Sequence, residues 1–445
     1  MRRSPCARRA MLFATARAPG VSLLRNRPAP MACASAASGV GELQGDTGMR
    51  CLRIKTITAV ALAAMLAANA AFAQAASKQT TLKPTSAQPA QLLAFVDDYA
   101  RQHDFSGSVL IVQHGKPRLA RQYGLANRAF AIRNDASTKY KIASITKAFT
   151  AVLILQLHEQ GRLDLDAPMR RYLPDYRGSG GDRVSVRQLL NHTSGLVNFD
   201  QVTDAAQAIR SGLPNYQLPH TARQLLDDYC SGDLVHAPGS KFDYNNCDYI
   251  ALGQIVERIY GQSYEQVLRD RIVDPLGLKD TGMLHQRDIV AGLADSYFRR
   301  DDSKVLTPDL PAYPENWYAA GAMYSTPRDL ARFADAWFGG RLIGDKALAA
   351  MIAPGLDDYG FGVWSYPVRI DGRSYRAVKR PGRIMGAQAQ LYRIVEAELT
   401  VVVLANTDAT DLDEFVARIG KQALSKQAAE GRASDTQASD KPATD

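Results

Sequence analysis

The chain has 445 residues, of which 22% are charged and 46% are hydrophobic. Residues 1–73 hold ten of its lysines and arginines but only two acidic residues, so the remainder has 44 basic and 43 acidic residues and a net charge of +1 instead of +9. This distribution removes the support for nucleic-acid binding. The composition is also too ordinary for a disordered or fibrous protein.

The N-terminal region predicts export. A short basic start at residues 49–55 precedes the apolar stretch 57–68 and the small-x-small sequence Ala71-Phe72-Ala73, which together are typical of a signal peptide over residues 49–73. We interpret residues 1–48 as an over-extended N-terminus, with a cytoplasmic extension ahead of a membrane anchor as the alternative. No cysteine follows at a lipoprotein-like position, which predicts a secreted or periplasmic protein without stable membrane insertion.

The predicted elements concentrate strands at the two ends of the chain. Residues 74–90 read as a linker, and residues 428–445 as a disordered tail. Between them, alternation, turn signals and helical periodicity predict a helix over 91–103, strands over 108–113, 118–123, 361–370, 373–379, 388–395 and 399–404, and a helix over 411–424. The Asp371-Gly372 pair is a strong hairpin signal.

Residues 140–340 are mostly helix and loop, so the strands of the two ends are expected to pair with each other. The predicted fold class is therefore α+β, with an antiparallel β-sheet flanked by helices and a large, mainly helical insertion. One domain over residues 91–427 accommodates all of these elements.

The first chemical motif is Ser144-Ile145-Thr146-Lys147. Residues three apart on a helix share a face, with Cβ atoms about 5–6 Å apart, and a neutral lysine can take a serine proton if its surroundings lower its pKa. The apolar residues that follow favour burial of this helix. Near a helix N-terminus, Ser144 would also lie beside backbone N–H groups able to stabilise an oxyanion. Taken alone, the motif is more often an ordinary helix start.

The second motif is Phe242-Asp243-Tyr244-Asn245-Asn246, just before a helical run. A phenol there can relay a proton, and the Asn246 amide can hold a substrate carbonyl. A core tyrosine with a helix-capping asparagine is the alternative.

The third motif is Lys379-Arg380-Pro381-Gly382-Arg383, expected directly before the penultimate strand. Gly382 permits close approach of a ligand, and the N–H of Arg383 is a candidate oxyanion donor. Arg380 is suited to bidentate binding of a substrate carboxylate. A solvated basic strand end is the alternative interpretation.

In order and separation, these motifs resemble the serine β-lactamase and penicillin-binding-protein-like hydrolases, nearest the class C β-lactamase, D-alanyl-D-alanine carboxypeptidase and related esterase branch. The resemblance extends over most of residues 91–425, with further similar stretches at 186–196, 320–325 and 401–406. It implies that Ser144 is the nucleophile, Lys147 its base or partner, and Tyr244 the proton relay. Asn246 would contact the substrate amide, and the N–H groups of Ser144 and Arg383 would form the oxyanion hole.

The third motif departs from the family pattern, in which Lys-Thr-Gly or His-x-Gly is usual. Arg380 keeps the positive charge but cannot shuttle protons, and Pro381 removes a backbone donor and a hydroxyl. Efficient β-lactam turnover is therefore disfavoured. The resemblance implies an exported serine hydrolase that forms an acyl-enzyme with an amide or ester, D-residue peptides and β-lactams being among the candidates. A small-ester carboxylesterase and a non-catalytic ligand-binding or sensor homologue are the alternatives.

Cysteine and histidine usage completes the predictions. Cys230 and Cys247 remain after removal of the leader, and a disulfide and two buried thiols are equally expected. The seven histidines lack metal-ligand spacing, so neither a metal nor another cofactor is predicted. His192 is interpreted as structural, at a helix end, in preference to a catalytic base. The expected partner is a small-molecule or peptide substrate, and the oligomeric state stays open.

Overall fold

The computed structural model describes residues 87–200, 212, 214–299 and 305–425. The leader, residues 1–48, the tail 428–445 and most of the linker 74–90 lie outside the described residues. The last four linker positions belong to helix α2, Ala87–Gln102, which therefore begins before the predicted residue 91. Among the helices of the described part, none has the length and apolar character needed to cross a membrane.

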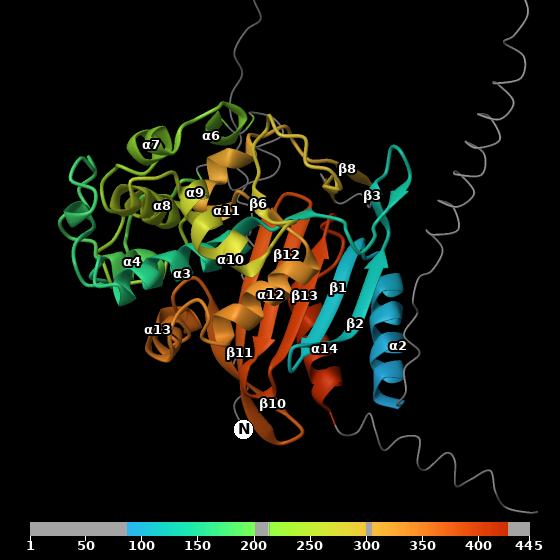
Figure 1. The fold of residues 1–445 in the computed structure, drawn as a ribbon. Helices are drawn as coiled ribbons and strands as arrows, with labels where there is room; N and C mark the ends of the chain where they lie inside the picture. Colours follow the sequence, from blue (N-terminus) through green and yellow to red (C-terminus); the bar gives the residue numbers. More distant parts are fainter. Residues whose placement is uncertain (1–86, 201–211, 213, 300–304, 426–445) are drawn as a thin grey trace, which may run out of the picture. The chain divides into compact units, whose positions relative to one another are not determined.

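The centre of the fold is a six-stranded antiparallel sheet in the order β10-β11-β12-β13-β1-β2 (Figure 1). Its strands are β1 Gly107–Gln113, β2 Lys116–Tyr123, β10 Trp364–Ile370, β11 Arg373–Ile384, β12 Ala387–Ile394 and β13 Leu399–Ala405. Gly107 of β1 lies opposite Ala405 of β13. The predicted pairing between the two ends of the chain is thus confirmed.

Strand β13 shows how the sheet separates two hydrophobic cores. All seven of its residues are buried. Because successive strand residues point to opposite faces, Val401 and Val403 enter one core while Val402 and Leu404 enter the other. A continuous apolar run in place of an alternating one therefore marks a strand that is covered on both faces.

The first core lies under α2 and the C-terminal helix α14, Leu412–Leu424. Tyr99 of α2 stacks on Phe415 of α14 with ring centroids 4.3 Å apart. Helix α12, Pro327–Phe338, packs over β13 and β1 on the opposite face, so the sheet has α12 in front and α14 behind in Figure 1.

The residues between β2 and β10 form the predicted helical insertion. Its helices are α3 Thr146–Glu159, α4 Val186–Leu190, α6 Pro214–Gln217, α7 Ala222–Gln224, α8 Asn246–Tyr260, α9 Tyr264–Leu268, α10 Asp274–Leu276, α11 Tyr318–Gly321, α12 and α13 Asp345–Met351. Short strands also occur there: β3 Leu125–Asn127, β4 Ile132–Arg133, β5 Tyr140–Lys141, β6 Gly282–Met283, β7 Tyr297–Arg299, β8 Leu306–Pro308 and β9 Met323–Ser325. Helix α3 is buried on all sides from Thr146 to Leu157, as its apolar sequence predicted.

Strand β11 extends to Ile384, five residues beyond the predicted strand 373–379, and so includes the third motif. Residues 380–384 were expected before a strand, but they form the second half of β11, where they pair with β12 as far as Ile384 opposite Ala387. Strand β10 pairs with β11 only up to Trp364 opposite Lys379. Residues 380–383 of the motif therefore lie in the part of β11 that extends beyond the end of β10.

Candidate active site

Ser144, Lys147 and Tyr244 meet at one point, as predicted. Ser144 lies in a 3₁₀ turn, Ala143–Ile145, immediately before α3, and Lys147 is in the first turn of that helix. Tyr244 lies just before α8 and donates from its hydroxyl to Ser144 Oγ over 2.9 Å. Lys147 Nζ lies 3.2 Å from the same oxygen. The serine hydroxyl is thus flanked by two groups that can exchange protons with it.

The surroundings of Lys147 suit a neutral amine. Its side chain is fully buried, and this burial lowers its pKa. Nζ donates to Asn246 Oδ1 over 2.7 Å and to the carbonyl oxygen of Ala320 over 2.9 Å. A neutral amine has two N–H bonds and one lone pair, and these two acceptors can take both protons. The lone pair is then directed at Ser144 Oγ.

Asn246 was predicted to contact a substrate amide, but in the structure its side chain binds groups of the protein. Its Oδ1 accepts from Lys147, and its Nδ2 donates to Asp200 Oδ2 over 2.8 Å, so both ends of the amide have partners within the protein. Burial raises the pKa of Asp200, which also accepts from the hydroxyl of Tyr216. Sequence reasoning missed Asp200, because no motif surrounds it and only folding brings it to Asn246.

Arg380 is placed next to the reacting groups, but not as a carboxylate site. The side chain is 1% exposed. It donates from Nε to the Ser144 carbonyl over 2.6 Å, from Nη1 to the Tyr359 hydroxyl over 2.8 Å, and from Nη2 to the Tyr244 hydroxyl over 2.7 Å. These internal bonds replace the predicted bidentate contact with substrate. Neither Tyr359 nor the Ala320 carbonyl was predicted as a partner in this site.

The phenol of Tyr244 is electrostatically tuned. Burial alone would raise its pKa, but the charge of Arg380, the charge of Lys147 in its protonated form, and the hydrogen bonds with Lys147 and Ser144 lower the pKa of Tyr244 to about 8. A phenol with this pKa can both accept and return a proton near neutral pH.

Gly382 brings β11 against the nucleophile. A Cβ at this position would lie 2.2 Å from the Ile142 carbonyl oxygen and 3.1 Å from the Ser144 nitrogen, so only glycine allows this approach. Pro381 has no N–H group, and a proline is best tolerated in a strand where the missing N–H would point away from a paired neighbouring strand. Arg383, two residues on, directs its N–H to the same edge, beyond the end of β10. This geometry suits the predicted oxyanion donors, the N–H groups of Ser144 and Arg383.

The side chain of Arg383 is directed elsewhere. It is 67% exposed and pairs with Asp408 at 3.8 Å. Alternation along β11 places it on the face opposite Arg380 and Gly382. Of the two arginines in the third motif, Arg380 is therefore buried beside the nucleophile, and the side chain of Arg383 lies on the opposite face of β11.

His192 takes the structural place that was preferred for it. The ring is fully buried, with Nδ1 2.8 Å from Asp248 Oδ2. It packs against the Tyr244 ring at a centroid distance of 4.5 Å, and burial lowers the pKa of His192. The ring therefore supports the loop that carries Tyr244.

Cys230 and Cys247 are joined in a disulfide, which resolves the two equally expected alternatives. Cys247 follows Asn246 in the first turn of α8, and its backbone nitrogen donates to the capping side chain of Asn245 over 2.8 Å. The bridge thus anchors the helix start that carries Tyr244 and Asn246. Within the described ranges, no cluster of three or more His, Cys, Asp or Glu residues is arranged to hold a metal ion.

Comparison with known proteins agrees with this geometry. The family model described as Beta-lactamase matches residues 92–424. PbpX of Bacillus subtilis (strain 168), whose name assigns it to the penicillin-binding proteins, is 28% identical over 306 residues, covering 67% of this chain and 73% of that protein. The protein flp of Staphylococcus aureus (strain MW2) is 33% identical over 187 residues, covering 41% of this chain and 36% of its own length.

Two solved structures extend the likeness to enzymes. A D-stereospecific amidohydrolase from Streptomyces sp. has a TM-score of 0.63 and 26% identity, covering 75% of this chain and 98% of that one. The D-amino acid amidase from Ochrobactrum anthropi SV3, complexed with L-phenylalanine, has a TM-score of 0.62 and 26% identity, covering 78% and 100%. The matched family, the fold and the assembled site agree. The chain belongs to the β-lactamase family and is a serine hydrolase with the β-lactamase and penicillin-binding-protein fold.

Proposed function

We propose that this protein hydrolyses small amides or esters through an acyl-enzyme on Ser144. The observation that carries the proposal is the position of Ser144 Oγ, 3.2 Å from Lys147 Nζ and 2.9 Å from the Tyr244 hydroxyl. An ordinary helix start does not bring two groups with lowered pKa values to one hydroxyl.

In the acylation step, Ser144 Oγ bonds to the substrate carbonyl carbon and its proton passes to the Lys147 and Tyr244 pair. The carbonyl oxygen becomes an oxyanion and is held by the N–H groups of Ser144 and Arg383. When the bond to the leaving group breaks, the Tyr244 hydroxyl returns a proton to that group. Water then attacks the acyl ester with the same pair as base, and Ser144 recovers its proton.

The substrate class follows from the groups that surround the reacting centre. All three nitrogens of the Arg380 guanidinium donate to groups of the protein, and the Arg383 side chain is turned away. A peptide with a free carboxylate beside the scissile bond thus has no cation from this motif to bind it. Neutral leaving groups are favoured, and the two structural neighbours act on D-configured amides by their titles. We infer an amide or ester of a D-amino acid in preference to a β-lactam or a carboxypeptidase substrate.

We also propose that the protein works outside the cytoplasm, in the periplasm or after secretion. The predicted signal peptide over residues 49–73 supports this location. The Cys230–Cys247 disulfide supports it independently, since such bridges form and persist in oxidising compartments.

The experiment is intact-mass labelling with a fluorophosphonate, and separately with a penicillin, of the protein and its Ser144→Ala variant. A phosphonate adduct that is absent from the variant is the expected result. The amides of D- and L-phenylalanine should then be hydrolysed at rates that differ at least about tenfold in favour of the D form. Lack of labelling would overturn the catalytic proposal and leave a ligand-binding homologue. Equal rates, or penicillin as the best acylating agent, would overturn the substrate assignment.

A further inference from the structure

The two proposed oxyanion donors lie on separate segments of the chain. The N–H of Ser144 belongs to the turn that follows β5, and the N–H of Arg383 belongs to β11. The two segments approach each other at Gly382. Among the strands of the described part, none pairs with the outer edge of β11 beyond Lys379. The distance between the two donors therefore depends on the contacts that hold this end of β11 in place.

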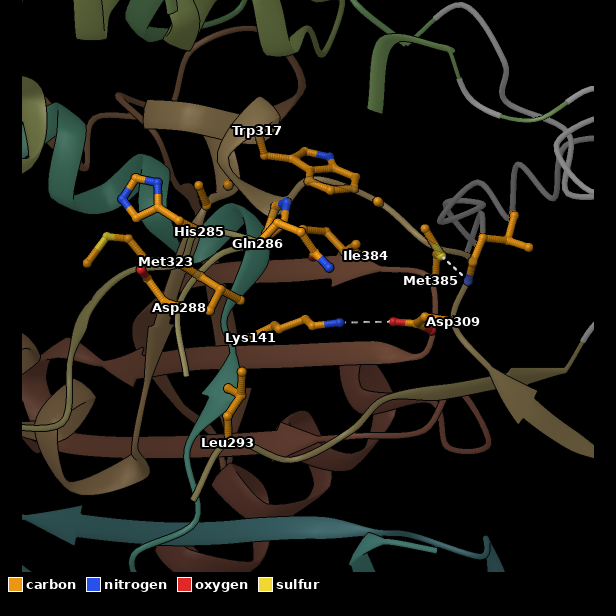
Figure 2. Close-up of a pocket in the computed structure, with 16 residues that line it drawn as sticks. Lys141, His285, Gln286, Asp288, Leu293, Asp309, Trp317, Met323, Ile384 and Met385 are labelled. Carbon is orange, nitrogen blue, oxygen red and sulfur yellow. Dashed lines mark hydrogen bonds and ion pairs between the residues drawn. The ribbon is translucent and has the colours of Figure 1, made fainter. Parts of the chain in front are cut away.

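One carboxylate, that of Asp309, joins both segments. Its Oδ1 accepts from the Gly386 nitrogen over 2.9 Å, in the turn that follows β11. Its Oδ2 lies 3.4 Å from Lys141 Nζ of β5, and Figure 2 shows these two side chains reaching toward each other. Lys141 precedes Ser144 by three residues. Gly386 follows Arg383 by three residues. Asp309 thus connects positions that are equally far along the chain from the two donors.

Asp309 is itself held firmly in place. Its side chain is 11% exposed, and Oδ2 also accepts from the Ser296 hydroxyl. Lys141 Nζ donates to the same hydroxyl oxygen over 3.0 Å. The Asp309 nitrogen donates to the Ser296 carbonyl over 3.1 Å, and the next nitrogen, that of Leu310, donates to Met385 Sδ over 3.2 Å. The carboxylate is therefore a fixed point to which the turn after β11 is attached.

The turn after β11 fits closely against this region. A Cβ at Gly386 would lie 2.1 Å from the Tyr297 carbonyl oxygen, so only glycine allows this contact. The turn is also short, because Ile384 lies directly opposite Ala387. A shift at Gly386 is therefore transmitted to Arg383 through only two intervening residues.

We propose that Asp309 is a positioning residue that sets the distance between the two oxyanion donors, an inference that rests on the proposed acyl-transfer function. Such donors act when they lie about 2.7–3.1 Å from the developing charge, and a misplacement of about 1 Å can cost about 100-fold in rate. Asp309 acts through Lys141 and Gly386 and does not itself hold the oxyanion. Because the oxyanion exists only along the reaction path, Asp309 should affect kcat and not KM.

The test measures p-nitrophenyl acetate hydrolysis and the rate of fluorophosphonate labelling in Asp309→Ala. Enzyme concentrations are taken from the final extent of labelling, so that unfolded molecules are not counted. Both kcat and the labelling rate should fall about 10–100-fold. Acylation and deacylation each pass through an oxyanion, so both should slow and KM should change less than about threefold.

A double variant separates this role from a general structural one. Gly382→Ala already forces β11 away from the Ser144 turn. Adding Asp309→Ala to it should lower kcat by less than about threefold more, because the distance that Asp309 sets is already lost. Damage to an unrelated part of the fold would instead multiply the two losses.

Two milder variants and a control complete the experiment. Asp309→Asn keeps an acceptor for the Gly386 nitrogen, and Lys141→Met keeps the carboxylate, so each removes only the ion pair. Both should lower kcat about 3–10-fold with KM unchanged. Asp335→Ala is the matched control, because Asp335 is 29% exposed and pairs with the buried Arg393 at 3.3 Å on the other side of the fold's helix α12 contact. Its kcat and labelling rate should equal those of the wild type.

The outcomes separate this inference from the function on which it rests. Wild-type kcat and labelling rate in Asp309→Ala would overturn the positioning role alone, and so would fully multiplied losses in the double variant. If Asp309→Ala yields no protein that can be labelled, a wild-type kcat in Lys141→Met overturns the role in the same way. Absence of both labelling and ester hydrolysis in the wild type would remove the acyl-transfer function together with the role of Asp309.

Discussion

The guanidinium of Arg380 donates from Nη2 to the phenolic oxygen of Tyr244 over 2.7 Å and from Nε to the carbonyl of Ser144 over 2.6 Å. One buried cation thus holds both the proton relay and the backbone of the nucleophile. A lysine has a single terminal nitrogen and cannot hold both groups in the same fixed geometry. The arginine that departs from the usual third motif is suited to this internal role.

Replacing Arg380 with glutamine should lower kcat of ester hydrolysis by about 100-fold or more, because Tyr244 loses the charge that stabilises its phenolate. Arg380→Lys should recover only part of this loss. Arg369→Gln, on the exposed part of β10, is the control and should leave kcat unchanged. An unaltered kcat in Arg380→Gln would contradict the link between the arginine and the relay.

The pH dependence of kcat/KM should reflect the Tyr244 pKa of about 8. A base must have lost its proton to accept one from Ser144, so activity should rise as the pH increases through about 8 and fall below it. Tyr244→Phe should lose this limb along with most of its activity. A wild-type profile that is flat between pH 6 and 9 would exclude the role assigned to the Lys147 and Tyr244 pair.

Asp200 is expected to be a positioning residue. By accepting from Asn246 Nδ2 it holds the amide oxygen toward Lys147. Asp200→Ala should let this amide rotate and should lower kcat about tenfold or more with little change in KM. Asp200→Asn should recover most of the rate, since its amide oxygen still accepts a hydrogen bond. The control Asp233→Ala, at an exposed position of the insertion, should behave like the wild type. A change in KM alone in Asp200→Ala would instead indicate that Asp200 binds substrate.

Gly382→Ala should open the oxyanion hole. The added methyl group would meet the Ile142 carbonyl at 2.2 Å, so β11 must move away from the Ser144 turn. Loss of one donor in such a hole costs about 10²–10³ in rate, and we expect a comparable fall in the rate of phosphonate labelling. Gly344→Ala, where the methyl group meets only the end of the Glu159 side chain, is the control. Equal labelling rates in Gly382→Ala and the control would argue against a tight approach of β11.

The disulfide should contribute to stability through the loop that it closes. Cys230 and Cys247 are separated by 17 positions. Replacing both with alanine should lower the free energy of unfolding by about 3 kcal/mol in urea titrations. The wild type in excess dithiothreitol should lose a similar amount. If reduction leaves the unfolding midpoint where it was, the bridge has no stabilising role.

Local patterns in the sequence determined much of this protein. The strands at its two ends, the buried helix after Ser144 and the two-residue turn at Asp371-Gly372 all follow from periodicity and turn chemistry, which act over a few residues. Ser144, Lys147 and Tyr244 were predicted as a set from the resemblance of the ordered motifs to the β-lactamase family, because each motif is weak evidence when taken alone.

The tertiary structure decided the partners of these residues. Arg380, Asn246 and Asp200 carry polar groups whose roles depend on which chain segments surround them. The sequence predicted that Arg380 and Asn246 would contact substrate, whereas folding directs both toward the interior, to Tyr244 and Lys147. Hydrogen bonds and burial that join residues as far apart as 144 and 380 are properties of the packed chain. No local pattern can specify them, and they are what adjusts the pKa values on which the proposed chemistry depends.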